Sequence, residues 1–229
     1  MTMRRGDMGD LTRNNDAQLL LPDFGYLVGA LVSGFNSRFR HHGVQVEVFE
    51  TLRPVELQRQ GYVNGRSKVD GVTRFSRHQF GGEGLAATVA CDLVLRVDGK
   101  WSWASKHIPY YNALGRMATA LGLQSGVDWD MDGVLVQHDP DESFYDGPHV
   151  QVPTREFRKI AQRMLRHLGY YSGKIDGIIG GWTTAALDCA RNQEGRHYGI
   201  SRIDPPTWNA LVLSTPLASR SMYVPEVKP

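Results

Sequence analysis

The sequence predicts an α+β fold, a small antiparallel sheet with flanking helices, joined to a small all-α domain of three helices. Three observations predict it. Segments with alternating apolar and polar residues, typical of half-buried strands, are interspersed with segments that have apolar residues at helical spacing. At Pro153-Thr154 the pattern changes, and only helical segments and Gly-rich turns follow. The 229 residues also suffice for one sizeable domain and one small domain.

Helices are predicted in the first part where apolar residues recur every three or four positions. Residues 24–39 and 110–123 have this spacing. A short helix is predicted at 54–62, because Pro54 suits a first helical turn, where a backbone N–H is not needed.

Strands are predicted where the alternation is clearest. Residues 44–49 alternate strictly, and a second strand at 90–97 ends at the turn Asp98-Gly99. Residues 126–146 are loop-rich and acidic, and a short final strand is predicted at 149–152.

The second part contains three predicted helices, at 155–168, 183–192 and 206–213. Thr154 is expected to cap the first of them. A unit of roughly sixty residues has only a marginal core of its own. We therefore divide the chain into residues 1–152, 153–215 and a loose tail, 216–229.

Composition excludes several classes of protein. With a net charge of +2 and a pI near 8.6, the chain is only mildly basic and does not resemble a nucleic-acid binder, which needs a concentrated basic stripe. The polar N-terminus has no apolar signal core, and the apolar stretch 19–35 is too interrupted by Pro and Gly to span a bilayer. Cys91 and Cys189 are expected to be reduced thiols of a protein made in the cytoplasm.

Three short stretches carry groups suited to a catalytic zinc, which takes about three His or carboxylate ligands and needs a nearby carboxylate to move a proton. They are Ser76-Arg-His78-Gln-Phe-Gly81, Ala90-Cys-Asp92-Leu and Asp146-Gly-Pro-His149-Val-Gln151. Each is weak alone, because a single His is more often a surface or core residue. In the third, the bend at Gly147-Pro148 lets Asp146 and His149 face one point, and beyond it His149 and Gln151 share a face.

Together the three stretches resemble the zinc D-alanyl-D-alanine carboxypeptidase and L-alanyl-D-glutamate endopeptidase family. Its hallmark is Ser-x-His-x-x-Gly, then Ala-x-Asp, then an acid shortly before a final His. The resemblance runs from about Leu20 to Val152 and includes Thr51-Leu-Arg53-Pro and Gly65-Arg-Ser67.

The resemblance implies a role for each matching residue. It implies that zinc is bound by His78, Asp92 and His149, on the sheet of the α+β domain. It implies Asp146 as the general base and Arg53 as the group that steadies substrate carboxylate or oxyanion charge. The positions expected to contact substrate are Ser76, Gln151 and Trp129. For Trp129, a core position is about as compatible with the sequence.

One departure concerns the second ligand. The family places its Asp seven residues after the first His, whereas Asp92 follows His78 by fourteen. The additional residues, at 82–89, are small and are expected to bulge as a loop. Glu83 is the rival second ligand, but Asp92 has the matching flanking residues.

The residue type and position of Asp146 indicate which reaction of the family to expect. Carboxypeptidases of the family tend to carry Glu close before the last His, whereas an Asp three residues ahead resembles the phage-type L-alanyl-D-glutamate endopeptidases. The prediction is an endolysin-like zinc endopeptidase that cleaves peptidoglycan stem peptides. A D,D-carboxypeptidase and a catalytically inactive wall-binding protein are the alternatives.

The second part resembles the three-helix peptidoglycan-binding domain. The matching stretches are Gln162–Leu187 and Ile203–Leu211, and the apolar residues expected in its core are Leu165, Leu168, Ile175, Ile178, Leu187, Trp208 and Leu211. The resemblance implies bacterial peptidoglycan as partner. We expect a monomer that neither binds nucleic acid nor inserts into membranes, and that reaches the wall after release from the cytoplasm in which it is made.

Overall fold

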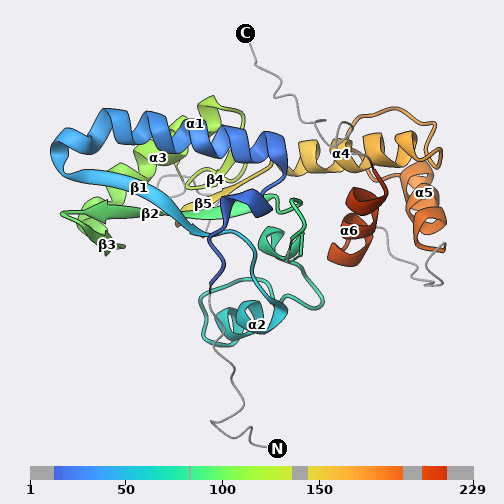
Figure 1. The fold of residues 1–229 in the computed structure, drawn as a ribbon, viewed down its shortest axis with the longest axis horizontal. Coiled ribbons are helices and arrows are strands. Elements are labelled where there is room, and N and C mark those ends of the chain that lie inside the picture. The colour runs from blue at the N-terminus through green and yellow to red at the C-terminus, as the bar shows by residue number, and fades with distance from the viewer. Residues whose placement is uncertain (1–12, 83, 136–143, 193–202, 216–229) are drawn as a thin grey trace, which may run out of the picture.

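The structure, a computed structural model, describes residues 13–82, 84–135, 144–192 and 203–215. In this part of the chain it is α+β, with an antiparallel sheet and helices beside it, followed by a helical C-terminal part (Figure 1). The predicted fold class is therefore confirmed. None of the described helices is long and apolar enough to cross a membrane.

The sheet has five strands: β1 (Val44–Glu50), β2 (Ala90–Val97), β3 (Lys100–Ser102), β4 (Gln124–Gly126) and β5 (Asp146–Gln151). Their order is β1-β2-β5-β4, with β3 paired to β2, and all these pairs are antiparallel. In this register Asp92 lies directly opposite His149. The sheet thus brings together two residues that are far apart in the sequence.

Two helices, α1 (Pro22–Phe39) and α3 (Ile108–Ala120), cover one face of the sheet (Figure 1). α1 forms because buried Phe24, Val28, Leu31 and Phe35 recur at helical spacing and face the strands. The other face carries α2 (Val55–Val63) and the long loops around it (Figure 1).

The C-terminal part contains α4 (Thr154–His167), α5 (Gly181–Asn192) and α6 (Pro205–Ser214). Its core centres on Trp208, which is fully buried and stacks on Phe157 at 4.5 Å between ring centroids. The apolar core continues from the sheet into these helices without a break. The indole N–H of Trp208 donates to the carbonyl of Ala87, in the loop before β2.

Four sequence-based expectations differ from the structure. Thr154 does not cap α4, because it is already the first helical residue and Pro153 precedes it without a side-chain cap. Ile178 is not a core residue, since 64% of it is exposed. β5 begins three residues earlier than predicted, at Asp146. The short strands β3 and β4 were not predicted, because three residues show too little alternation to be recognised.

Candidate metal centre

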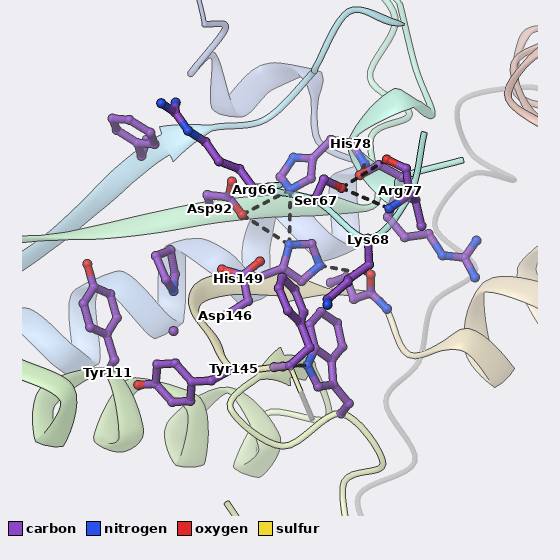
Figure 2. Close-up of a pocket in the computed structure, with 18 of the residues that line it drawn as sticks. Arg66, Ser67, Lys68, Arg77, His78, Asp92, Tyr111, Tyr145, Asp146 and His149 are labelled. Carbon is purple, nitrogen blue, oxygen red and sulfur yellow. Dashed lines mark hydrogen bonds and ion pairs between the residues drawn. The ribbon is translucent and has the colours of Figure 1, made fainter. Parts of the chain in front are cut away.

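Three side chains from separate elements converge on one point. His78 comes from a single 3₁₀ turn (Arg77–Gln79), Asp92 from β2 and His149 from β5. The distances from His78 Nε2 to Asp92 Oδ1, from His78 Nε2 to His149 Nδ1, and from His149 Nδ1 to Asp92 Oδ1 are each 3.2 Å (Figure 2). These three atoms can bind one metal ion. The structure therefore brings together the three residues predicted as ligands.

Strand alternation places two of the three converging side chains, those of Asp92 and His149. Cys91 and Leu93 lie in the core beside α1, so Asp92 between them points to the opposite face of β2. On β5, Val150 is in the core, while His149 and Gln151 lie together on the other face and are hydrogen-bonded.

Local hydrogen bonds place His78. Ser76 forms a capping box around the turn: its hydroxyl accepts from the His78 N–H at 3.4 Å, and its own N–H donates to Gln79 Oε1. The carbonyl of His78 accepts from the backbone N–H of Arg53 at 2.9 Å. Beside the substrate contact predicted for Ser76, these bonds indicate that it orients His78.

In each histidine ring, the nitrogen that points away from the other two side chains is hydrogen-bonded. This bond determines whether the opposite ring nitrogen, which faces Asp92, carries a proton or a lone pair. Nδ1 of His78 lies 2.7 Å from the carbonyl of Thr51 and must donate to it. Nε2 of His149 lies 3.0 Å from Gln151 Oε1, the acceptor end of that amide. Both inward nitrogens are then lone-pair acceptors, and they face a carboxylate oxygen. Three acceptors at this separation are stabilised by a shared cation, so the donor set fits a metal ion.

The electrostatics of the two carboxyl groups differ. Burial alone would raise the pKa of Asp92, but when protons rather than a metal ion lie between the three groups, the charges and hydrogen bonds of the protonated His78 and His149 lower it well below its usual range. Asp146 lies beside this group in Figure 2, and burial followed by the charge of Asp92 raises its pKa. The pKa values of the two carboxyl groups are thus shifted in opposite directions. Asp92 is suited to be an ionised ligand, and Asp146 is suited to carry a proton.

Arg53 contacts Asp92 directly. Its guanidinium donates to Asp92 Oδ2 at 2.8 Å, to Gln58 Oε1 at 3.0 Å and to Glu50 Oε2. Burial lowers the pKa of Arg53, but the charges of Asp92 and Glu50 outweigh this effect and raise it. Arg53 was predicted to steady substrate charge; it lines the cavity beside these side chains, and its contacts show that it also holds the second oxygen of Asp92.

A cavity of about 800 Å³ opens beside the three side chains. Trp129 lines it, with its ring centroid 5.2 Å from that of His149, and the indole N–H donates to the carbonyl of Phe144. Gln151, also predicted to contact substrate, lines the cavity as well, and its amide is hydrogen-bonded to His149 and Gln124.

Sequence reasoning did not assign the basic side chains at the rim of this cavity. Arg66 and Lys68 line it, and Figure 2 shows both near the three central side chains. The segment Gly65-Arg-Ser67 contributes only to the family resemblance. The signal for Arg66 and Lys68 was present in the sequence, as two cations in a polar loop, but such pairs usually lie on a solvated surface.

The turn that carries His78 is also held by the C-terminal helices. Arg77 lies 3.7 Å above the ring of Phe157, and Phe80 packs on the same ring at 5.1 Å. The backbone N–H and carbonyl of Gly81 bind the side-chain amide of Asn209, on α6, at 2.9 and 2.7 Å. The loop between His78 and Asp92 is therefore anchored on α6. Glu83, the rival ligand, lies outside the described residues.

Comparisons with known proteins give two findings. Residues 154–188 match the model of a peptidoglycan binding domain family. A crystal structure of the L-Ala D-Glu endopeptidase ChiX of Serratia marcescens is similar over 65% of this chain and 95% of that chain, at 24% identity and a TM-score of 0.39. Likeness at this level carries no argument about function. No curated protein is similar enough to the chain to count as a match.

Proposed function

We propose that this protein is a zinc-dependent endopeptidase that hydrolyses the L-alanyl-D-glutamate bond of peptidoglycan. One observation carries the proposal: two imidazole nitrogens and a carboxylate oxygen meet at 3.2 Å beside a large cavity, with a second carboxyl group next to them. The match of residues 154–188 to a peptidoglycan binding domain supports the wall as substrate.

Zinc would be held by His78, Asp92 and His149, a donor set that zinc accepts. When bound, zinc supplies Lewis acidity, which activates water at neutral pH and polarises a carbonyl group. The bond that His78 Nδ1 donates to the carbonyl of Thr51 and the bond that Arg53 donates to Asp92 keep the ligand atoms directed inward.

Asp146 would take the proton from the attacking water and return it to the amine that leaves. Its raised pKa suits this exchange, because a carboxyl group that holds its proton more readily is a better acid and base near neutral pH. Arg66 and Lys68 at the rim are placed to attract the carboxylates of a stem peptide.

The rest of the chain would hold the enzyme on its substrate. In this proposal residues 1–152 form the catalytic unit, 153–215 the wall-binding unit and 216–229 a tail. Attachment to the wall raises the effective concentration of stem peptide at the site. The enzyme acts as a monomer.

The experiment that tests the reaction is mass spectrometry of purified peptidoglycan digested with the zinc-loaded protein. New L-alanine carboxyl termini and new D-glutamate amino termini are expected. Release of free D-alanine with the L-alanyl-D-glutamate linkages intact would replace the proposal with a D,D-carboxypeptidase. An unchanged digest would leave a wall-binding protein without this activity.

The matched variants are His149→Ala and Asp146→Asn. His149→Ala should lose both zinc and activity. Asp146→Asn should retain zinc, measured by elemental analysis, and lose at least about a hundredfold in rate, the usual contribution of a positioned acid–base group. A fully active Asp146→Asn protein would refute the role given to Asp146.

A further inference from the structure

The acidic loop after β4 holds a second group of carboxylates, at alternate positions. One carboxylate oxygen each of Asp128, Asp130 and Asp132 lies within 4.8 Å of the others. Calcium binds oxygen at 2.3–2.6 Å, so oxygens on opposite sides of one ion lie up to about 5 Å apart. The three groups are therefore close enough together to share a single calcium ion.

A second observation is the state of Asp128. Only 3% of this residue is exposed, and its Oδ1 has no hydrogen-bond partner among the residues that the structure describes. Burial raises the pKa of Asp128, and the charges of Asp130 and Asp132 raise it further, against the backbone N–H groups of Gly133 and Met131. A buried carboxylate oxygen without a partner is costly, and a bound cation removes that cost.

The backbone of the loop is already folded around these groups. Asp130 Oδ1 accepts from the Asp132 N–H at 3.1 Å, and Asp132 Oδ1 accepts from the Val134 N–H at 2.7 Å. The run Asp-x-Asp-x-Asp-Gly has the same spacing as the first six positions of calcium-binding EF-hand loops, including the glycine at the sixth. The twelfth position falls on Asp139, which lies outside the described residues and is not counted in the site.

We propose that Asp128, Asp130 and Asp132 bind a calcium ion, and that this ion holds Trp129 in place beside the metal centre. Trp129 is the residue between the first two carboxylates. Binding of calcium is independent of the proposed hydrolase function. Its effect on zinc binding rests on the zinc site of that proposed function.

Two contacts link the loop to His149. The ring of Trp129 packs on the ring of His149 at 5.2 Å. The carbonyl of Trp129 accepts from Gln124 Nε2, Gln124 Oε1 accepts from Gln151 Nε2 at 2.5 Å, and Gln151 Oε1 lies 3.0 Å from His149 Nε2. An ion that orders Trp129 therefore also orders the amides that direct His149 toward the centre.

The first experiment titrates calcium chloride into the zinc-loaded full chain, with calorimetry and tryptophan emission as readouts. We expect one calcium per chain, with a Kd of roughly 10⁻⁵–10⁻³ M, and weaker binding of magnesium, which demands shorter bonds. Asp130→Asn and Asp132→Asn should each weaken binding at least about tenfold, the loss typical even for residues that only support a ligand.

Asp98→Asn is the matched control, because it makes the same change of charge in an exposed turn whose positive φ of 49° Asn also tolerates. Its calcium affinity should equal that of the unchanged protein. Absence of saturable binding up to about 10 mM calcium, well above the weakest sites of this kind, would overturn the site. The site would also be overturned if both loop variants bound calcium as tightly as the unchanged protein.

The second experiment tests the link to His149 without using hydrolysis. Zinc affinity is measured by competition with a chelating dye, with and without saturating calcium. Coupled sites typically change one another's affinity by fivefold or more, so a gain of at least about fivefold is expected. Gln124→Met should abolish the gain and retain calcium binding, because it removes the amide that joins the two sites. Unchanged zinc affinity in the presence of bound calcium would refute the coupling, whether or not the protein proves to be a hydrolase.

Discussion

Asn209 provides a direct test of whether the C-terminal helices stabilise the candidate metal centre. Its side-chain amide makes two hydrogen bonds to the backbone of Gly81, at 2.9 and 2.7 Å, across 128 residues of sequence. Gly81 is buried and has a φ of +124°, and an added Cβ there would lie 2.6 Å from Thr88 Oγ1. The backbone at Gly81 is thus fixed, and it follows His78 by three residues.

The change Asn209→Ala removes both bonds and leaves two buried backbone groups without partners. Each net hydrogen bond contributes about 1 kcal/mol, and each unpaired buried group can raise the loss further, so we expect about 2–3 kcal/mol. Ala is the better helix former by up to about 0.7 kcal/mol, which offsets part of this loss in α6. The net cost of about 2 kcal/mol corresponds to a fall in Tm of roughly 4–8 °C for a chain of this length.

The assay combines thermal unfolding with zinc affinity. Leu213→Ala is the control, because it lies on the same helix with 66% of its surface exposed and should change Tm little. Since Gly81 restrains the turn that carries His78, we also expect Asn209→Ala to bind zinc several-fold more weakly. A Tm within about 1 °C of that of the control, a difference below 1 kcal/mol, would refute the anchoring argument. A lowered Tm with unchanged zinc affinity would restrict the role of Asn209 to stability.

Three further changes test separate parts of the reasoning. In the metal-free protein Asp146→Asn should raise Tm near pH 7, by about 2–4 °C for each kcal/mol of stability gained. Folding raises the pKa of Asp146, so this carboxyl group stabilises the folded state at low pH, and that stability is lost as the pH rises through the folded-state pKa. Asn carries no charge at any pH, so the gain in Tm should vanish in acid. Arg53→Lys should weaken zinc binding roughly tenfold in a dye competition assay, because Lys lacks the planar fork that holds Asp92; equal affinity would contradict that role. Trp182→Ala should reduce sedimentation with purified walls and leave Tm unchanged, because Trp182 is 75% exposed; Leu213→Ala is its control, and equal sedimentation would exclude Trp182 as a wall contact.

Local patterns in the sequence were enough to predict much of the sheet. β2 was predicted with the same bounds as observed, because its apolar run ends at the turn Asp98-Gly99, whereas β1 was predicted from strict alternation. The same alternation placed His149 and Gln151 on one face of β5. The convergence of His78 with these strands followed from a resemblance, since no periodicity connects a 3₁₀ turn to a strand fourteen residues later.

Partners that depend on three-dimensional packing were not predictable in this way. The guanidinium of Arg53 has the same chemistry whether it binds substrate or Asp92, and only the register of β1 against β2 brings it to Asp92. Ile178 has the composition of a core residue, yet it is exposed in a turn where the backbone, not the side chain, is bound by Gln162. Apolar character alone does not distinguish a core position from an exposed contact surface.

The unusual separation of His78 from Asp92 has a structural explanation in the same contacts. The intervening loop supplies the carbonyl of Ala87 to Trp208 and the backbone of Gly81 to Asn209. A shorter loop between His78 and Asp92 would bring fewer backbone hydrogen-bonding groups to α6. The residues between these two candidate ligands are therefore also the surface on which the C-terminal helices pack. Because the apolar core is continuous across that surface, the C-terminal helices and the sheet that carries Asp92 and His149 pack as one body.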